Sequence, residues 1–217
     1  MHPHRTLVLA TRNRGKTAEI RALLKDYPVD IVNLDDFGPI PEAVEDGATF
    51  DENAYKKASL AARVLGLPAL ADDSGLVVAA LGGAPGVHSA RYAGAHATDA
   101  DRCARLLEAM AGCPDRRAAF ECVISIAVPA GPALTYEARC EGTIAEVPAG
   151  ANGFGYDPIF YYPPLGRTFA QLSPEEKNRV SHRGLALREL AAEFPKVLAW
   201  IRYQMPNPEP AVCLRGD

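Results

Sequence analysis

The sequence predicts an α/β protein built around a mixed β-sheet, and three observations lead to that prediction. Short apolar runs alternate with helical periodicity in the first third of the chain, which is typical of a β-α-β unit. Two apolar stretches, at 118–128 and 134–144, are joined by the turn sequence Pro-Ala-Gly-Pro and favour an antiparallel hairpin. No repeat or low-complexity linker interrupts the 217 residues, so a single domain is expected.

The elements of the first half follow from apolar patterning and from a helix cap. Residues 49–65 begin with the capping box Thr-Phe-Asp-Glu, which predicts a helix. The run at 67–71 predicts a buried strand that ends at Asp72 and Asp73 and is followed by a Ser-Gly turn. Before these elements, a strand, a helix and a second strand are expected at 6–10, 15–25 and 29–34.

Caps also mark the helices of the second half. Thr98 should cap a helix that ends near residue 112. Ser173 is followed by proline at the first helical position and by glutamate at the third, so a helix should begin there. Ser181 could cap a further helix. Flexible ends are expected at 1–5 and 205–217.

Composition narrows the class of protein. The net charge of −4 and the isoelectric point near 5.8 argue against a nucleic-acid binder, because such proteins usually carry a basic excess. No apolar run approaches the ~20 residues of a transmembrane helix, and the N-terminus lacks the apolar core of a signal peptide. Five cysteines without a C-x-x-C pair favour free thiols. A cytoplasmic protein that binds neither nucleic acid nor membrane is expected.

The first turn, TRNRGK at residues 11–16, follows a strand and opens a helix. Backbone N–H groups at such a turn and the positive end of the helix attract phosphates. Thr11 and Asn13 add short polar donors, and Lys16 adds a point charge. Residues 10–17 lack one glycine of a P-loop and carry two arginines in the loop. A phosphate site is therefore predicted, with a P-loop nucleotidase as a rival interpretation.

Two adjacent carboxylates, Asp72 and Asp73, lie at the expected end of a strand, where open α/β sheets place their ligands. Neighbouring residues of an extended chain point to opposite faces, so one carboxylate can face a metal ion while the other orients its neighbours. Mg²⁺ is typically held by one or two carboxylates together with substrate phosphates. Glu45 and Asp46, in the loop before the helix expected at 49–65, could supply a further carboxylate.

Two consecutive lysines in that helix differ in their expected surroundings. Lys56 follows Glu52 by one helical turn, which predicts a solvated ion pair. Lys57 shares a face with alanines that should pack inward, so its ammonium group needs a phosphate or a carboxylate as a partner. Lys57 is therefore the expected functional lysine.

Aromatic and basic residues in the last third of the chain indicate a region that could bind a nucleobase. Residues 154–157 place aromatic side chains on a glycine-containing loop, which is a platform suited to stacking. Lys177 lies in the helix that Ser173 begins, and His182 and Arg183 open the helix after Ser181. These side chains offer hydrogen-bond donors to a base edge or to an anion.

The order of these motifs resembles the inosine triphosphate pyrophosphatase family, whose members are also known as XTP/dITP diphosphatases. The resemblance extends from about Thr6 to Phe194 and rests on several blocks in the family's order. The blocks are ATRNRGK, FDENAYKKA, ADDSGL, LGGAPGVHSARYAG, GFGYDPIF and EEKNRVSHRG.

The resemblance implies roles for the matching residues. Asp73 would be the general base and a Mg²⁺ ligand, with Glu45 as a second metal ligand. Lys57 would be a catalytic residue beside the triphosphate, and Phe154 would stack on the purine. The residues implied to bind the substrate are Thr11, Arg12, Asn13, Arg14, Gly15, Lys16, Ser74, Phe154, Gly155, Tyr156, Asp157, Lys177, His182 and Arg183.

The reaction implied by the resemblance is hydrolysis of ITP, dITP or XTP to the monophosphate and pyrophosphate, with Mg²⁺ as the cofactor. This activity would remove deaminated purine nucleotides before polymerases use them. Donors such as Arg183 would pair with the 6-oxo group and oppose the amino group of adenine. The family further implies an elongated mixed sheet flanked by helices, two lobes with the active site in the cleft between them, and a homodimer. The glycine-rich loop at 82–94 would take part in the dimer contact.

Two rival functions lead to different expected results. A P-loop ATPase or GTPase would release phosphate and a nucleoside diphosphate, and Thr17 would bind Mg²⁺. A non-catalytic sensor of purine nucleotides would bind ITP without turnover. The paired carboxylates and the two lysines favour an enzyme.

Overall fold

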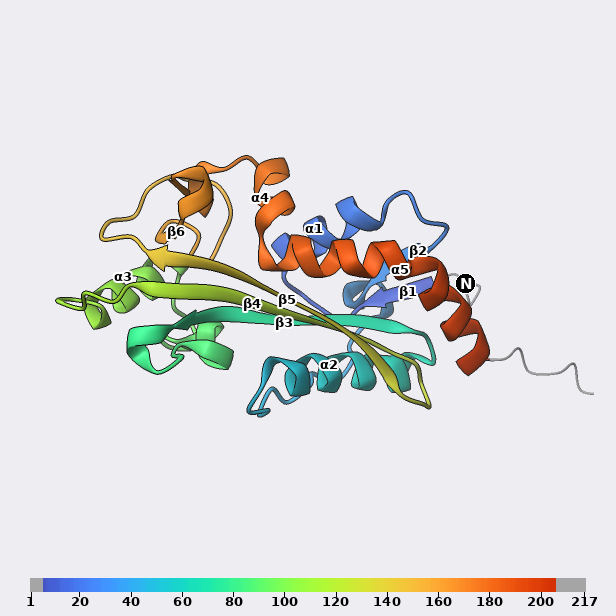
Figure 1. Ribbon diagram of the computed structural model, residues 1–217. Helices are drawn as coiled ribbons and strands as arrows, with labels where there is room; N and C mark the ends of the chain where they lie inside the picture. Colours follow the sequence, from blue (N-terminus) through green and yellow to red (C-terminus); the bar gives the residue numbers. More distant parts are fainter. Residues whose placement is uncertain (1–5, 206–217) are drawn as a thin grey trace, which may run out of the picture.

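A computed structural model describes residues 6–205, apart from the side chain of Leu23, and shows the mixed sheet that the sequence predicts (Figure 1). In these residues the strand order is β2-β1-β3-β4-β5-β6-β7. β1 pairs in parallel with β2 and β3, and the pairs from β3 to β7 are antiparallel. The strands are β1 (Thr6–Leu9), β2 (Asp30–Asn33), β3 (Ala69–Val78), β4 (Arg117–Ala127), β5 (Ala133–Ile144), β6 (Phe160–Tyr162) and β7 (Arg167–Thr168).

Helices cover both faces of the sheet. One face packs against α2, whereas α1 and α5 lie together on the opposite face (Figure 1). The α-helices are α1 (Arg14–Leu24), α2 (Phe50–Leu65), α3 (Asp99–Ala109), α4 (Pro174–Val180) and α5 (His182–Gln204). Short 3₁₀ segments lie at η1 (Leu34–Phe37), η2 (Ala79–Leu81), η3 (Gly86–Arg91), η4 (Pro163–Leu165) and η5 (Phe169–Gln171).

The predicted helix caps are confirmed. Thr49 Oγ1 accepts a hydrogen bond from the backbone N–H of Glu52 at 3.1 Å. Ser173 and Glu176 form a reciprocal capping box, and Thr98 caps α3 in the same way. Ser181 Oγ accepts from the third residue of α5 at 3.1 Å. These caps satisfy N–H groups that the first helical turn leaves without partners, so short sequence motifs were enough to place the helix starts.

The turn expected after Asp73 is wrong, because β3 continues to Val78. β4 pairs with β3 along this whole stretch, and Asp73 lies opposite Val123. The backbone hydrogen bonds from this long partner strand outweigh the local turn preference of Asp-Asp-Ser-Gly. Gly75 is needed in the strand because a Cβ atom there would lie 2.5 Å from the carbonyl oxygen of Gly86.

The hydrophobic core is divided along β3. Leu70 belongs to a cluster beneath α1 and α5, whereas Leu76 belongs to another cluster with α3 and β6. On the opposite face of the sheet, Ala69 and Ala71 pack beneath α2. The polar residues 72–75 lie between these apolar regions. The fold therefore places the Asp-Asp-Ser-Gly segment at the junction of its separate clusters.

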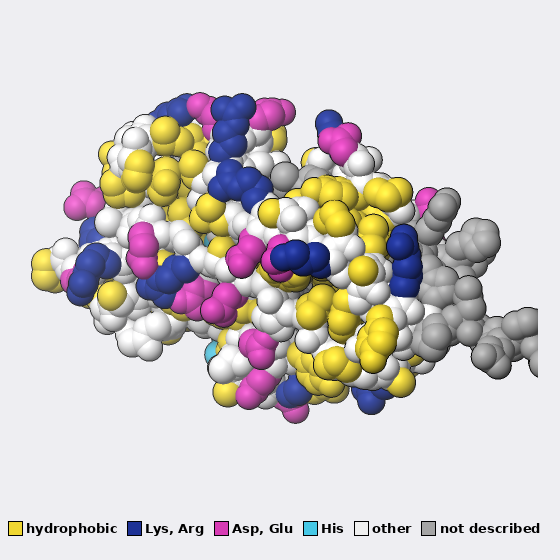
Figure 2. All heavy atoms as spheres, turned by 45° about the vertical axis from the view of Figure 1, so that its right-hand side comes forward, with side chains coloured by type: hydrophobic (Ala, Val, Ile, Leu, Met, Phe, Trp, Pro, Cys, Tyr) yellow, Lys and Arg dark blue, Asp and Glu magenta, His cyan; other side chains and the backbone are white. Residues whose placement is uncertain are grey.

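Several expectations from composition can be compared with residues 6–205. No helix in this range is both long and apolar enough to cross a membrane. Acidic and basic side chains are intermixed on the face shown in Figure 2. The cysteines of the described part are free, as predicted, at positions 103, 113, 122 and 140. The predicted flexible ends lie outside the described residues except for Met205, whose N–H donates to the carbonyl of Ile201 at 2.9 Å.

Candidate active site

A cleft of about 620 Å³ opens beside the polar segment of β3. Its walls come from the turn before α1, the loop before α2 and α2 itself, η3, the start of α3, the loop before β6, and residues of α4 and of the start of α5. Almost all of the predicted site residues line this cleft: Thr11, Arg12, Asn13, Gly15, Lys16, Glu45, Lys57, Asp73, Ser74, Phe154, Gly155, Tyr156, Asp157, Lys177, His182 and Arg183.

Arg14 is the predicted substrate-binding residue that does not line the cleft. It is exposed at the first position of α1 and borders a separate, smaller cavity together with Thr17 and Arg21. Thr11 and Arg12 border both cavities, so the structure places Arg14 near these two candidate residues but outside the main cleft.

The turn before α1 is organised by its own polar side chains. Asn13 caps the helix, with its Oδ1 accepting from the backbone N–H of Lys16 at 3.1 Å. Thr11 Oγ1 accepts from the N–H of Asn13 at 3.2 Å. The Lys16 ammonium group reaches β3, where its Nζ lies 3.1 Å from Asp72 Oδ2. The helix terminus and the lysine together form a positive region suited to phosphate.

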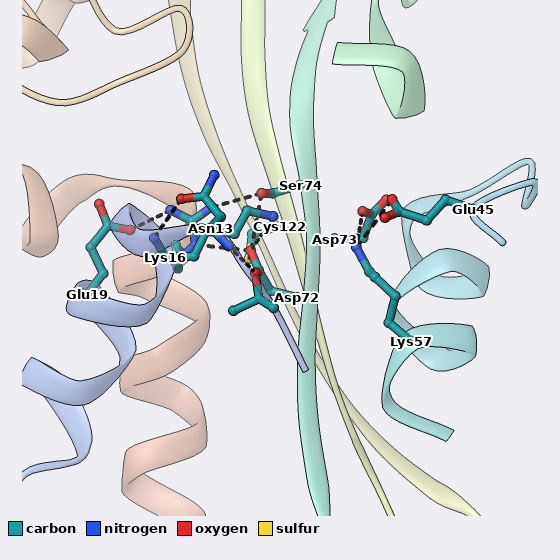
Figure 3. Close-up of polar contacts among 11 residues, drawn as sticks. Asn13, Lys16, Glu19, Glu45, Lys57, Asp72, Asp73, Ser74 and Cys122 are labelled. Atoms are coloured by element: carbon teal, nitrogen blue, oxygen red, sulfur yellow. Dashed lines mark hydrogen bonds and ion pairs between the residues drawn. The ribbon is translucent and has the colours of Figure 1, made fainter. Parts of the chain in front are cut away.

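Asp72 and Asp73 point to opposite faces of β3, as predicted (Figure 3). Asp72 is fully buried, and its Oδ2 accepts from Arg183 Nε at 3.1 Å and from Ser74 Oγ at 3.2 Å. Burial alone would raise the pKa of Asp72, but the charges of Lys16 and Arg183 hold this pKa well below its usual range. Asp72 therefore remains a carboxylate that anchors cations from α1 and α5.

Asp73 faces α2, where its Oδ1 accepts from Lys57 Nζ at 2.6 Å. The same ammonium group lies 3.4 Å from Glu45 Oε2. Burial raises the pKa of Asp73, and the charge of Lys57 only partly opposes this shift. Asp73 is thus a more basic carboxylate than an exposed aspartate, and it borders the cleft directly.

The two lysines of α2 separate as expected, but one predicted ion pair is wrong. Lys57 faces the cleft, whereas Lys56 lies away from it and pairs with Asp46 Oδ1 at 2.6 Å rather than with Glu52. Glu52 is engaged in the helix start, where its Oε2 accepts from the N–H of Ala48 at 2.7 Å. The hydrogen bond between Glu52 and Ala48 therefore replaces the ion pair expected between Glu52 and Lys56.

Glu45 and Asp73 form a donor set that fits a magnesium ion. Both carboxylates already share a cation, the Lys57 ammonium group, at the wall of the cleft. Mg²⁺ commonly takes one or two carboxylates and completes its shell with water and substrate phosphates. Residues 6–205 contain no group of three or more Asp, Glu, His or Cys side chains placed to hold a metal ion by themselves. A metal ion held by Asp73 and Glu45 would therefore take its remaining ligands from water and phosphate.

The aromatic segment forms the other wall of the cleft. Asp157 Oδ2 accepts from the backbone N–H of Phe154 at 2.8 Å and from Lys177 Nζ at 2.7 Å. Lys177 Nζ also lies 4.6 Å from the centroid of the Phe154 ring. Tyr156 turns inward, and its hydroxyl donates to the carbonyl of Ser89 at 2.9 Å. The Phe154 ring therefore borders the cleft, while Tyr156 supports the segment from the core.

His182 and Arg183 are both buried at the start of α5. The guanidinium group of Arg183 donates to Asp72, to Glu19 and to Ser74 Oγ, the last at 2.9 Å. All three contacts are to residues of the protein, so the pairing of Arg183 with the 6-oxo group of a purine stays a prediction.

The His182 ring stacks on Phe120 with centroids 4.6 Å apart. Burial and the nearby charges of Arg183 and Lys177 lower the pKa of His182 well below its usual value, so its ring is neutral. Its buried Nδ1 atom has no hydrogen-bond partner among the described residues.

Sequence reasoning missed two carboxylates. Glu19 accepts from Arg183 and lies 3.5 Å from Lys177 Nζ. Its position three residues after Lys16 on the same helix face was the available signal. Asp99, at the start of α3, accepts from the backbone N–H of Gly155 at 2.7 Å. The sequence alone does not show this contact between segments far apart in the chain.

Comparisons with known proteins agree with this geometry. The sequence model of the Ham1 family matches residues 7–193. A dITP/XTP pyrophosphatase from Syntrophobacter fumaroxidans is 66% identical over 198 residues, which are 91% of this chain and 85% of that protein. A dITP/XTP pyrophosphatase from Geobacillus kaustophilus is 50% identical over 194 residues, 88% of this chain and 95% of that protein.

Solved structures show the same fold. A HAM1 protein from Coxiella burnetii superimposes with a TM-score of 0.83 at 49% identity, covering 88% of this chain and 98% of that one. The dITP/XTP pyrophosphatase from Mycobacterium abscessus has a TM-score of 0.72 at 45% identity, covering 88% and 99%. The motifs, the sheet and these matches agree: the chain belongs to the Ham1 family, which confirms its resemblance to the inosine triphosphate pyrophosphatases.

Proposed function

We propose that this enzyme hydrolyses deaminated purine nucleoside triphosphates, namely dITP, XTP and ITP, to the monophosphate and pyrophosphate. One observation carries the proposal. Asp73 lies in a single cleft with a helix terminus suited to phosphates and an aromatic segment suited to a base. The names of the bacterial relatives point to the same reaction.

The phosphate end of the substrate would lie over the turn before α1. Asn13 and Thr11 hold this turn in a fixed conformation, so the N–H groups that open α1 are already in place. Lys16 and Lys57 both line the cleft and pair with the aspartates on opposite faces of β3. Their positive charges would stabilise the negative charge that develops as the phosphate bond breaks.

Asp73 is suited to act as the general base. Its carboxylate, made more basic by burial, can orient a water molecule and accept its proton at an Oδ atom. A Mg²⁺ ion held by Asp73 and Glu45 would supply charge neutralisation on the phosphates. Lys57 keeps Asp73 in one orientation through its 2.6 Å contact.

The base would lie against Phe154, near Lys177 and His182. Stacking binds any purine, so selectivity has to come from polar groups at the base edge. His182 is neutral and has an unpartnered Nδ1, which could meet a polar atom of the base. A mismatched buried donor costs about 1–3 kcal/mol, so discrimination against ATP needs more than one such contact.

The P-loop alternative is not supported by the placement of Thr17. That residue lies on the outer side of α1, at the smaller cavity, and it does not line the cleft. The paired carboxylate and lysine at Asp73 also favour catalysis over a role as a sensor. A homodimer with the 82–94 loop at its contact, and a cytoplasmic location, remain parts of the proposal.

A product assay tests this function. The purified enzyme is incubated with Mg²⁺ and, in parallel, with dITP, XTP, ITP, GTP and ATP, and pyrophosphate is separated from phosphate. We expect pyrophosphate and monophosphate from the first three substrates, and little turnover of GTP and ATP. Nucleoside diphosphate with free phosphate would support the P-loop alternative, and binding without turnover would support the sensor.

A further inference from the structure

We propose that Asp99 is a positioning residue that holds the aromatic segment 153–157 in its base-binding conformation. This inference rests on the proposed function, because it assumes that Phe154 stacks on the purine. Asp99 belongs to α3, and neither the family resemblance nor the motif blocks give it a role. Its side chain borders the cleft and is about half exposed, with a relative accessibility of 44%.

The first step is that side chains of α3 form hydrogen bonds with both the N–H group and the carbonyl group of Gly155. Asp99 Oδ2 accepts from the Gly155 N–H at 2.7 Å. One helical turn later, the thiol of Cys103 donates to the Gly155 carbonyl, with the sulfur and oxygen 3.4 Å apart. Burial raises the pKa of Cys103 to about 11, so the thiol keeps its proton and remains a donor. Two side chains of one rigid helix therefore fix the backbone of the residue next to Phe154.

The second step is that Asp99 is itself held in place. Its other carboxylate oxygen pairs with Arg102. The same guanidinium group donates to the carbonyl of Ala90 at 3.0 Å and to that of Ala97 at 2.7 Å. Ala90 belongs to η3, which also lines the cleft. The Asp99–Arg102 pair thus connects two cleft walls that are distant in the sequence.

The third step is that the aromatic segment needs such an anchor. Gly153 and Gly155 have φ angles of +77° and +63°, values that favour glycine. A segment with two glycines loses much conformational freedom when it adopts one conformation. One charge-assisted hydrogen bond from Asp99 and a weaker one from the Cys103 thiol offset this cost and keep Phe154 ready to stack before the substrate arrives.

Asp99→Ala, Asp99→Asn and a matched control, Asp101→Ala, test the inference. Asp101 lies in the same helical turn and accepts from the N–H of Thr98 at 2.8 Å, and it does not line the cleft. We expect D99A to raise KM for dITP by about 10-fold, the equivalent of one charge-assisted hydrogen bond, with kcat changed less than about 2-fold. D99N should raise KM by only about 3-fold, because its amide oxygen can still accept from Gly155 although its NH2 group loses the ion pair with Arg102.

Hydrogen exchange gives a readout that does not depend on turnover. The amides of residues 153–157 should exchange faster in D99A than in the wild type and D101A. Cys103→Ala, which removes the weaker contact, should cause a smaller change in the same direction. Equal KM values for D99A and D101A, or unchanged exchange in D99A, would overturn the inference. Absence of dITP turnover by the wild type would instead reject the proposed function, and the exchange result would still stand by itself.

Discussion

The two faces of β3 carry adjacent aspartates with opposite surroundings. Asp72 is enclosed by a lysine, an arginine and a serine, which in turn connect to Glu19 and Lys177. Asp73 has one close cation, Lys57. The other carboxylate that this cation contacts, Glu45, belongs to an exposed loop. The pKa of Asp72 is lowered and that of Asp73 is raised, although the two side chains share one strand.

The fold thus places a network that holds cations on one face of β3 and the more basic carboxylate on the other face. On the Asp72 face, the buried carboxylate holds Lys16 and Arg183, two cations that line the cleft, and compensates their charges. The Asp73 face is open to the cleft and keeps a carboxylate available for a proton or a metal ion. The alternation of side chains along a strand is enough to produce both environments from consecutive residues.

The largest effect should come from removing the reactive carboxylate. Asp73→Asn is expected to lower kcat for dITP by about 10²–10⁴-fold, since the amide cannot accept the proton of the attacking water. The melting temperature should change less than in a variant of Asp72, because Asp73 pairs with one cation, Lys57, which also lies near Glu45. Steady-state kinetics with a thermal melt check both parts. A variant with more than a tenth of the wild-type kcat would show that another group serves as the base.

The matching substitution on the other face should mainly affect stability. Asp72→Asn leaves Lys16 and Arg183 without their shared counter-charge, which should lower the free energy of unfolding by about 3 kcal/mol. Urea denaturation of D72N and D73N side by side measures the difference. Equal losses in the two variants would contradict the separation of the two faces.

A smaller effect on kcat is expected from the two consecutive lysines of α2, Lys56 and Lys57. Lys57→Met should lower kcat by about 10- to 100-fold, because it removes a cation that faces the phosphates. Lys56→Met should stay within about 2-fold, since its pair with Asp46 is largely exposed. Parallel kinetics on the two variants are the measurement. A comparable loss in both would mean that the effect comes from α2 as a whole.

The smallest expected effect concerns the close approach of Gly15, in the turn before α1, to Phe154 in the aromatic segment. A Cβ atom at Gly15 would lie 2.9 Å from Cε1 of Phe154, so Gly15→Ala must displace the ring. We expect KM for dITP to rise by about 2- to 5-fold. Thr17→Ala, in the same turn but on the outer side, should leave KM unchanged. Binding measurements with both variants decide whether Phe154 depends on this close approach.

Much of the fold was predictable because its signals are local. Thr49, Ser173 and Ser181 mark helix starts through contacts within three residues, and the structure confirms them. The hairpin of β4 and β5 was also correct, because its turn residues lie between two long apolar runs. The opposite orientation of Asp72 and Asp73 required only the period of an extended strand.

The remaining features depend on contacts between distant segments. The course of β3 past Asp73 is decided by pairing with β4, which the turn-like local sequence conceals. The partners of Glu19 come from α4 and α5, at the other end of the chain. The role of Asp99 likewise depends on a loop more than fifty residues later, as its contact with Gly155 spans 56 positions. The spacing of Lys16 and Glu19 places them on one face of α1, but a single sequence does not show which distant residues they meet, so these partners could be assigned only from the structure.

The three long strands also determine how the molecule can deform. β3, β4 and β5 run without a break from one core cluster to the next, and each is paired along nearly its whole length (Figure 1). A pivot at a single peptide would have to break several ladder hydrogen bonds at once. Adjustment of the cleft walls is therefore easier in segments outside these ladders, such as the exposed loop that carries Glu45. The long ladders thus make the sheet stiff along these strands, and Asp73 lies near the middle of β3.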